Sequence, residues 1–261
     1  MERVKAKTRG HFTFNIGKPE NLPALVRKAN AFGKSLNSAI TVDTYMGDIK
    51  QMFTELEHEE IKLAVIWILD LYREKAGNTI KIRKRLSKEK TEKHYNVVTG
   101  NSCVSAKLYT TMTLEQLESI IYFDLDNAIC RVGAMIYRQI RGIPMGSHLS
   151  PALAYLICLY YERRIPLRIP SRHLSHIFGA RYMDDLLIII IWPADDGILE
   201  TMLHNALQMI VDTSLPDPIY HENLKIKQEF DPRGAPCLGT LITVDDSNTI
   251  HIRYLNKNET S

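Results

Sequence analysis

Apolar residues at helical spacing mark the most regular part of the chain. Between residues 58 and 76 they recur every three or four positions, and the pattern stops before Gly77, a residue typical of helix C-terminal caps. The stripe consists of Ile61, Val65, Ile68, Leu69 and Tyr72. We therefore predict a helix over residues 58–76.

Local signals predict where further helices begin. Thr113 and Gln116 form a capping-box pattern ahead of an apolar stretch. Ser150 followed by Pro151 places an N-cap residue before a proline at the first helical position, and residues 153–161 continue as an apolar run. Two more helices are predicted, an amphipathic one over residues 198–211 and a short one over residues 25–32.

Alternating and β-branched segments predict the strands. Residues 181–192 indicate a strand pair around an acidic tip, because Asp184-Asp185 interrupts an otherwise apolar run. Residues 129–139 indicate a hairpin that is broken at Val132-Gly133. Later strands are expected over residues 225–230, 238–244 and 249–254. The sequence has no internal repeat or low-complexity linker, so we expect one α+β unit.

The net charge of the chain says little about the class of protein, whereas the local clustering of charged residues is informative. The 261 residues carry 33 Lys and Arg against 30 Asp and Glu, and the net charge of +3 is too small to indicate a polyanionic partner by itself. Basic residues gather in residues 79–94, which we expect to form a solvated loop or ribbon. The longest apolar run, residues 186–192, is far shorter than the roughly 20 residues of a membrane-spanning helix. We expect no membrane association.

The cysteines and the basic start of the chain bear on the compartment. Four widely spaced cysteines show neither a CxxC pair nor zinc-ligand spacing, so we expect free thiols in a reducing, intracellular compartment, nuclear or cytoplasmic. They are Cys103, Cys130, Cys158 and Cys237. The basic stretch after Met1 has no apolar core behind it, which argues against a signal peptide.

Three segments match the chemical demands of nucleotidyl transfer. That reaction uses two divalent cations, one to activate the attacking 3′ hydroxyl and one to neutralise the leaving pyrophosphate. Magnesium binds through one or two protein carboxylates together with substrate phosphates. The segments are GDIKQMF at 47–53, RGIPMGSHLSPALA at 141–154 and RYMDDLLI at 181–188.

These segments resemble, in order, the first three motifs of the reverse transcriptases, and the third contains their YxDD box. ENLKIKQEF at 222–230 and PCLGTLI at 236–242 are similar to the lysine-bearing fourth motif and the primer-grip turn, so the resemblance covers roughly residues 40–245. It implies an α+β fold of the right-hand polymerase palm type, an antiparallel sheet packed on helices. A strand bearing Asp48 would lie beside the hairpin tip that carries Asp184 and Asp185.

The resemblance also implies the activity, that of an RNA-directed DNA polymerase of a retroelement. Asp48, Asp184 and Asp185 would be the catalytic residues and would bind two Mg²⁺ ions, with Mn²⁺ as a substitute. The partners would be an RNA template, a DNA or RNA primer and deoxynucleoside triphosphates. Three carboxylates this close would repel one another without a cation, so the site should depend on metal and be weak at low pH.

A second group of residues is expected to contact the incoming nucleotide. The Phe53 ring would leave no room for a 2′ hydroxyl, so the expected product is DNA. Lys227 or Lys225 would meet the triphosphate or the leaving pyrophosphate, and the sequence does not decide which of the two does so. Ile49, Met145 and Gly146 complete this group, and Met145 stands where many relatives carry glutamine.

The template and primer are expected to contact two loops, the YMDD hairpin and a basic run. The glycines of the GIPMGS loop allow close approach of the backbone, and a proline stiffens the loop. The basic run is expected to contact phosphates without sequence preference, or else to be an ordinary solvated face. These residues are Tyr182, Met183, Gly142, Pro144, Ser147, Leu238, Gly239, Lys81, Arg83, Lys84 and Arg85.

The chain departs from full-size reverse transcriptases at both ends. Residues 1–47 hold no Arg-Pro-Ile element, and little follows residue 254, so we expect reduced fingers and little or no thumb. The expected organisation is a lead-in or abbreviated fingers over residues 1–40, a palm over 41–245 with a basic insertion at about 78–107, and a C-terminal strand and tail over 246–261. Two rival functions are an RNA-dependent RNA polymerase and an inactive, domesticated polymerase fold that binds nucleic acid.

Overall fold

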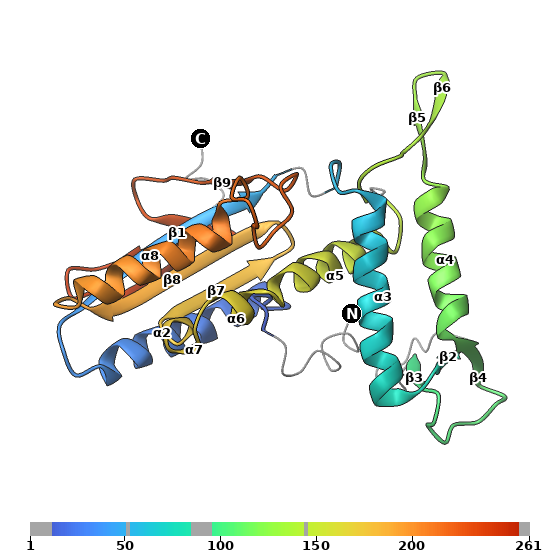
Figure 1. The fold of residues 1–261 in the computed structure, drawn as a ribbon, viewed down its shortest axis with the longest axis horizontal. Helices are drawn as coiled ribbons and strands as arrows, with labels where there is room; N and C mark the ends of the chain where they lie inside the picture. Colours follow the sequence, from blue (N-terminus) through green and yellow to red (C-terminus); the bar gives the residue numbers. More distant parts are fainter. Residues whose placement is uncertain (1–11, 51–52, 85–95, 144–145, 256–261) are drawn as a thin grey trace. The chain divides into compact units, whose positions relative to one another are not determined.

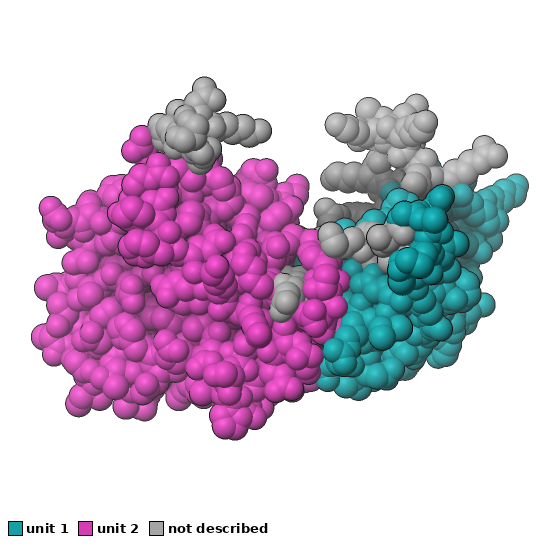
Figure 2. All heavy atoms as spheres, turned by 90° about the horizontal axis from the view of Figure 1, so that it is seen from above, with its two compact units in different colours: residues 1–10, 57–157 teal, residues 11–56, 158–261 magenta. Residues whose placement is uncertain are grey.

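The computed structural model describes residues 12–50, 53–84, 96–143 and 146–255. The chain divides into two units, which Figure 2 distinguishes by colour. Unit 1 comprises residues 1–10 and 57–157, and unit 2 comprises residues 11–56 and 158–261. The sequence predicted one α+β unit, whereas the contacts within the chain divide it into two compact units. The domain boundaries drawn from the sequence stay a prediction.

A four-stranded antiparallel sheet forms the centre of unit 2 (Figure 1). Its strands are, in spatial order, β7 (Ile177–Tyr182), β8 (Asp185–Pro193), β1 (Ile40–Ile49) and β9 (Ile226–Gln228). Strand β8 is the apolar run of the sequence, and its residues between the two ends are all buried. Burial on both faces explains why this strand reads as continuously apolar rather than alternating.

Different layers cover the two faces of this sheet. Helix α2 (Leu22–Ser35) and a second sheet of β10 (Ala235–Cys237), β11 (Thr240–Val244) and β12 (Ile250–Tyr254) share a hydrophobic core with Leu187 and Ile189 of β8. Trp192, whose side chain points to the opposite face, packs edge-on against His204 of α8 (Gly197–Val211). The short helices are η1 (Pro19–Asn21), α6 (Ile165–Arg168) and α7 (Ser171–Leu174).

Unit 1 contains two long helices and two small sheets. The helices are α3 (His58–Ala76) and α4 (Leu114–Asp126), and the sheets are β3-β2-β4 and the hairpin β5-β6. The strands are β2 (Thr79–Arg83), β3 (Val97–Thr99), β4 (Tyr109–Thr113), β5 (Ile129–Val132) and β6 (Met135–Arg138). Helix α5 (Ser150–Glu162) begins in unit 1 and ends in unit 2.

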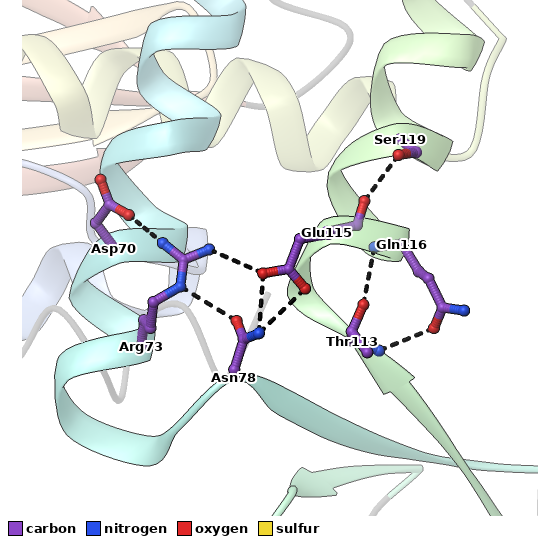
Figure 3. Close-up of polar contacts among 7 residues, drawn as sticks. All are labelled: Asp70, Arg73, Asn78, Thr113, Glu115, Gln116 and Ser119. Atoms are coloured by element: carbon purple, nitrogen blue, oxygen red, sulfur yellow. Dashed lines mark hydrogen bonds and ion pairs between the residues drawn. The ribbon is translucent and has the colours of Figure 1, made fainter.

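The ends of α3 and α4 in unit 1 are fixed by polar contacts (Figure 3). Arg73 donates through Nε to Asn78 Oδ1 at 3.1 Å and also pairs with Asp70. Asn78 in turn donates to both carboxylate oxygens of Glu115, in the first turn of α4, at 2.9 and 3.1 Å. The C-terminal end of α3 is therefore linked to the N-terminal end of α4.

The capping box predicted at Thr113 is present. The Thr113 hydroxyl accepts a hydrogen bond from the Gln116 backbone N–H at 3.2 Å, and the Gln116 side chain accepts one from the Thr113 N–H at 3.0 Å (Figure 3). The predicted helix over residues 58–76 has the bounds of α3, and Gly77 ends it with φ 78°. Among the described residues no helix is long and apolar enough to cross a membrane.

Candidate active site

Strand register places four of the predicted site residues in one row across the sheet of unit 2. Asp48 of β1 lies opposite Asp185 of β8, and Asp185 lies opposite Tyr182 of β7. On its other side Asp48 lies opposite Lys227 of β9. Directly opposite residues of antiparallel strands point to the same face with Cβ atoms about 5 Å apart. Lys227 therefore lies beside Asp48 on the face of the two carboxylates, whereas Lys225 precedes β9 and is not opposite either of them.

The two-residue turn between β7 and β8 carries the third carboxylate. Met183 adopts φ 56°, a left-handed conformation that costs a non-glycine residue roughly 1–2 kcal/mol. Two-residue hairpin turns with positive φ at the first central position normally have glycine there. The Ile49 N–H donates to the Asp184 carbonyl oxygen at 2.9 Å. This bond fixes the acidic turn against the end of β1.

The carboxylates interact with one another electrostatically. Burial raises the pKa of Asp185 to about 6, and the negative charges of Asp184, Asp48 and Glu229 add to this effect while Lys50 opposes it. A carboxyl group near neighbouring carboxylates is hard to ionise unless a cation joins them. The site therefore has an excess of negative charge that a divalent cation can neutralise.

Two residues of this site, Lys50 and Glu229, were missed in the sequence analysis. The Lys50 ammonium forms an ion pair with Asp48 and lies 3.8 Å from Glu229 Oε1. The hydrogen bond with Asp48 raises the pKa of Lys50. Alternation gave a signal for both, because Lys50 follows Asp48 by two residues and Glu229 follows Lys227 by two.

The donor set suits magnesium, although it is not assembled as a complete cage. Carboxylate oxygens are the hard ligands that Mg²⁺ prefers, and it usually takes one or two of them together with substrate phosphates and water. No group of three His, Cys, Asp or Glu side chains within the described part of the chain forms a ready-made metal site. The Lys50 ammonium, which is paired with Asp48, partly neutralises the negative charge of the carboxylates.

The residues that follow Asp48 differ in exposure. Ile49 is buried, with 1% of the residue exposed, and its N–H is bonded to the Asp184 carbonyl, so its predicted contact with the nucleotide stays a prediction. Phe53 is partly buried and lies in a turn beyond β1. Residues 51 and 52, between them, lie outside the described residues.

The turn that resembles a primer grip lies between β10 and β11. Leu238 and Gly239 have φ values of 51° and 74°, the pattern of a two-residue hairpin turn with both central residues left-handed. Burial raises the pKa of the adjacent Cys237 thiol to about 12, and the charge of Asp185 contributes to this. This turn and the carboxylates therefore share one region of unit 2.

The GIPMGS loop belongs to unit 1. Gly142 and Gly146 have φ values of 80° and 100°, which side chains rarely tolerate, and the Gly142 carbonyl lies 3.1 Å from His58 Nε2. Ser147 donates to Asp124 Oδ2 at 2.7 Å. Pro144 and Met145 lie outside the described residues, so their predicted contacts stay predictions.

Part of the basic run is a strand rather than a solvated loop. Lys81 and Arg83 belong to β2, which pairs with β3 and β4. Lys81 donates to the Ser102 carbonyl at 2.8 Å, and Lys84 donates to the Ala106 carbonyl at 3.1 Å. These ammonium groups hold a neighbouring loop, while Arg85 lies outside the described residues.

Comparison with known proteins identifies the fold. The sequence has no significant match among protein-family models or curated proteins. The structure is similar to apo telomerase from Candida tropicalis, with a TM-score of 0.67, 10% identity and coverage of 97% of this chain and 39% of that one. It is also similar to telomerase of the same organism in complex with the TWJ fragment of telomeric RNA, with a TM-score of 0.68, 11% identity and coverage of 100% and 36%.

A third similar structure is telomerase from Candida albicans with the same kind of RNA fragment. Its TM-score is 0.63 at 11% identity, with coverage of 92% of this chain and 36% of that one. The chain thus spans less than half the length of the telomerase chains that it matches. At this identity the likeness concerns the fold alone. The fold is that of a reverse-transcriptase-like polymerase domain, a mixed α+β structure of antiparallel sheets packed on helices.

Proposed function

We propose that this chain is the polymerase domain of an RNA-directed DNA polymerase, which adds deoxynucleotides to the 3′ hydroxyl of a primer. One observation supports this most directly. The register sets Asp48 opposite Asp185, with Asp184 in the turn whose carbonyl accepts the Ile49 N–H. A sheet that brings three carboxylates together in this way suits catalysis that depends on metal, because carboxylate oxygens are the ligands that Mg²⁺ prefers.

The proposed division of labour follows from the positions of the side chains. Asp48, Asp184 and Asp185 would hold two Mg²⁺ ions, which when bound lower the pKa of the 3′ hydroxyl and neutralise the leaving pyrophosphate. Lys227, in the same row as the acids, would donate a proton to the pyrophosphate. Lys50 would move from Asp48 toward the triphosphate as the cations bind.

The substrates are proposed on two further grounds. Phe53 follows Asp48 by five residues, and a ring at this point would exclude a 2′ hydroxyl, so the product would be DNA. Two of the structures with the same fold are telomerases in complex with an RNA fragment, which supports RNA as a partner; its use as the template is proposed from the sequence resemblance. The assignment to a retroelement rests on the sequence motifs alone.

A second candidate function is a polymerase fold that binds nucleic acid without catalysis. The pairing of Lys50 with Asp48 favours it, because this ammonium takes the place of a cation. The absence of a ready-made three-residue metal group in the described residues points the same way. All three acids are nevertheless present, and a module that only binds has no need of them.

Primer extension separates the two candidates. We expect the purified chain to extend a DNA primer on an RNA template with Mg²⁺ or Mn²⁺, and Asp184→Asn to abolish extension, because removing one metal ligand leaves the attacking hydroxyl unactivated. Asp195→Asn, which changes an exposed aspartate of the same unit, serves as the control and should retain activity.

The result can also exclude catalysis. If the wild type incorporates no more nucleotide than Asp184→Asn over a series of Mn²⁺ concentrations, while both bind the template-primer equally, the chain is a binding module. Far-ultraviolet circular dichroism of the two proteins shows whether the substitution has left the fold intact.

A further inference from the structure

A fully buried ion pair lies directly behind the acidic turn of unit 2. Arg181, the last but one residue of β7, and Glu162, the last residue of α5, both have completely buried side chains. Arg181 Nε donates to Glu162 Oε1 at 2.5 Å. Two formal charges are thus buried in the interior. One of them, that of Arg181, lies three residues before Asp184 in the sequence.

Glu162 is held by partners from three separate segments. Its Oε2 accepts hydrogen bonds from the Thr13 hydroxyl at 2.5 Å and from the Phe14 N–H at 3.1 Å. Its Oε1 also accepts one from the Tyr220 hydroxyl at 3.0 Å. Burial raises the pKa of Tyr220 well above its ordinary value, so this hydroxyl keeps its proton and donates. The carboxylate is therefore immobilised.

Arg181 transmits this fixed position to the turn. Its Nη1 donates to the Met183 carbonyl oxygen at 3.1 Å, and Met183 is the residue in the left-handed conformation. The backbone of Arg181 is held as well, because its N–H donates to the Phe14 carbonyl at 2.7 Å and its carbonyl accepts from the Ile16 N–H at 3.1 Å. The guanidinium thus connects the immobile Glu162 with the peptide unit between Met183 and Asp184.

We propose that Arg181, anchored by Glu162, is a positioning residue that holds the Met183-Asp184 turn in the conformation that presents Asp184 and Asp185 to metal. The role in presenting the carboxylates to metal rests on the proposed polymerase function. The contacts of Arg181 with Glu162 and Met183 do not depend on that function. A left-handed methionine persists only where its surroundings determine it, and the bond from Nη1 to the Met183 carbonyl is a contact that acts directly on this residue.

Stability alone does not account for this pair. Replacing a buried ion pair by uncharged residues of similar size is often neutral or stabilising, because both charges must be removed from water. Arg181 Nη2, moreover, is buried without a hydrogen-bond partner among the described residues, which adds to that cost. An arginine rather than a lysine is required to reach Glu162 and the Met183 carbonyl at the same time, since the two bonds come from separate nitrogens of a rigid plane, whereas the three donors of a lysine share one nitrogen.

The first test keeps the charge and removes the second donating nitrogen. In Arg181→Lys the ammonium can still pair with Glu162, so the melting temperature should stay close to that of the wild type. Binding of Mn²⁺ alone, followed by electron paramagnetic resonance, should weaken roughly tenfold, as is usual when a group that orients a metal ligand is lost. Hydrogen exchange at the Ile49 amide, which is bonded to the Asp184 carbonyl, should become faster.

Arg168→Lys is the matched control. Arg168 also belongs to unit 2, and it also contacts both a carboxylate and a backbone carbonyl, in this case those of Asp217. It makes no contact with the acidic turn through these groups. We expect Arg168→Lys to leave both Mn²⁺ affinity and Ile49 exchange unchanged.

A double variant removes both charges and separates stability from positioning. Arg181→Met with Glu162→Gln leaves no unpaired buried charge and keeps an oxygen for Tyr220 or Thr13. The proposal expects a folded protein with fast Ile49 exchange and weak Mn²⁺ binding. A double variant that melts like the wild type and keeps wild-type exchange and affinity would overturn it, as would Arg181→Lys with both readouts unchanged.

The two proposals can fail separately. If the wild type neither binds Mn²⁺ nor extends a primer, the polymerase function is wrong, and Ile49 exchange still decides whether Arg181 positions the turn. If the wild type is active and Ile49 exchange is the same in all variants, the positioning role is wrong and the polymerase function stands.

Discussion

Asp185 links the electrostatics of the site to the stability of the protein. Its pKa is raised from the ordinary value of 3.8 to about 6, so between these values the folded state binds more protons than the unfolded state. The stabilisation that this group provides is fully present below pH 3.8 and is lost as the pH rises through 6. Stability without metal should therefore fall over this window.

Asp185→Asn tests this pH dependence. The full shift corresponds to roughly 3 kcal/mol, and because the side chain is only partly buried we expect about 1 kcal/mol. At pH 7, without metal, the variant should be more stable than the wild type by that amount, and at pH 4 the difference should disappear. Urea denaturation at the two pH values measures it, with Asp195→Asn as the control. An equal difference at both values would mean that Asp185 ionises normally.

Phe53 allows a prediction about the product. If its ring excludes the 2′ hydroxyl, Phe53→Ala should lower the ratio of kcat/KM for a deoxynucleotide to that for the matching ribonucleotide by roughly tenfold or more, because a few kcal/mol of steric exclusion is removed. Phe32→Ala, which truncates a ring packed on the core of the same unit, controls for general loosening. An unchanged ratio in Phe53→Ala removes the support for DNA as the product.

Sequence alone predicted some residues of the candidate site and not others, for a physical reason. Asp48, Asp184 and Asp185 stand in motifs whose order along the chain carries the information. Lys50 and Glu229 act through proximity, and proximity depends on which strands pair and in what register. The choice between Lys225 and Lys227 was open for the same reason, and the register with Asp48 singles out Lys227.

At the scale of elements, the basic strand β2 allows a prediction about nucleic-acid binding. Replacing Lys81, Arg83, Lys84 and Arg85 by Ala should weaken template-primer binding, and each lost phosphate contact should reduce the slope of log K against log salt by roughly 0.7–0.9. Lys81 and Lys84 also hold carbonyl groups of the loop after β3, so a small loss of stability should accompany the change.

Binding at a series of KCl concentrations measures this slope. Lys107→Ala removes an exposed charge from the same unit and should change it by one contact at most. If the quadruple variant has the slope of the wild type, β2 is an ordinary surface strand and other basic residues hold the nucleic acid.

Elements with clear local signals were predicted well, and three short strands of unit 1 were not. Helix α3, the capping box at Thr113 and the hairpin of β7 and β8 rest on residues close in sequence. Strands β2, β3 and β4 were not predicted, because each is short and the basic residues of β2 hide its alternation. Their pairing, rather than their composition, makes them strands.

At the scale of the whole molecule, the sheet of unit 2 is assembled from two distant stretches of the chain. Strand β1 precedes the main segment of unit 1, residues 57–157, whereas its neighbours β8 and β9 follow that segment. The motif order therefore predicted the polymerase-like fold, which depends on this pairing, while the arrangement into two units could not be inferred, since a sequence without linkers gives no sign of where one core ends.

This interruption has a consequence during synthesis on the ribosome. When β1 leaves the exit tunnel, both of its hydrogen-bonding neighbours are still untranslated, and it remains an unpaired apolar edge of the kind that aggregates. The strands that follow within residues 57–157 pair among themselves and can form their sheets at once. We expect the nascent chain to acquire structure from its middle outward, with Asp48 meeting Asp185 only after β8 has emerged.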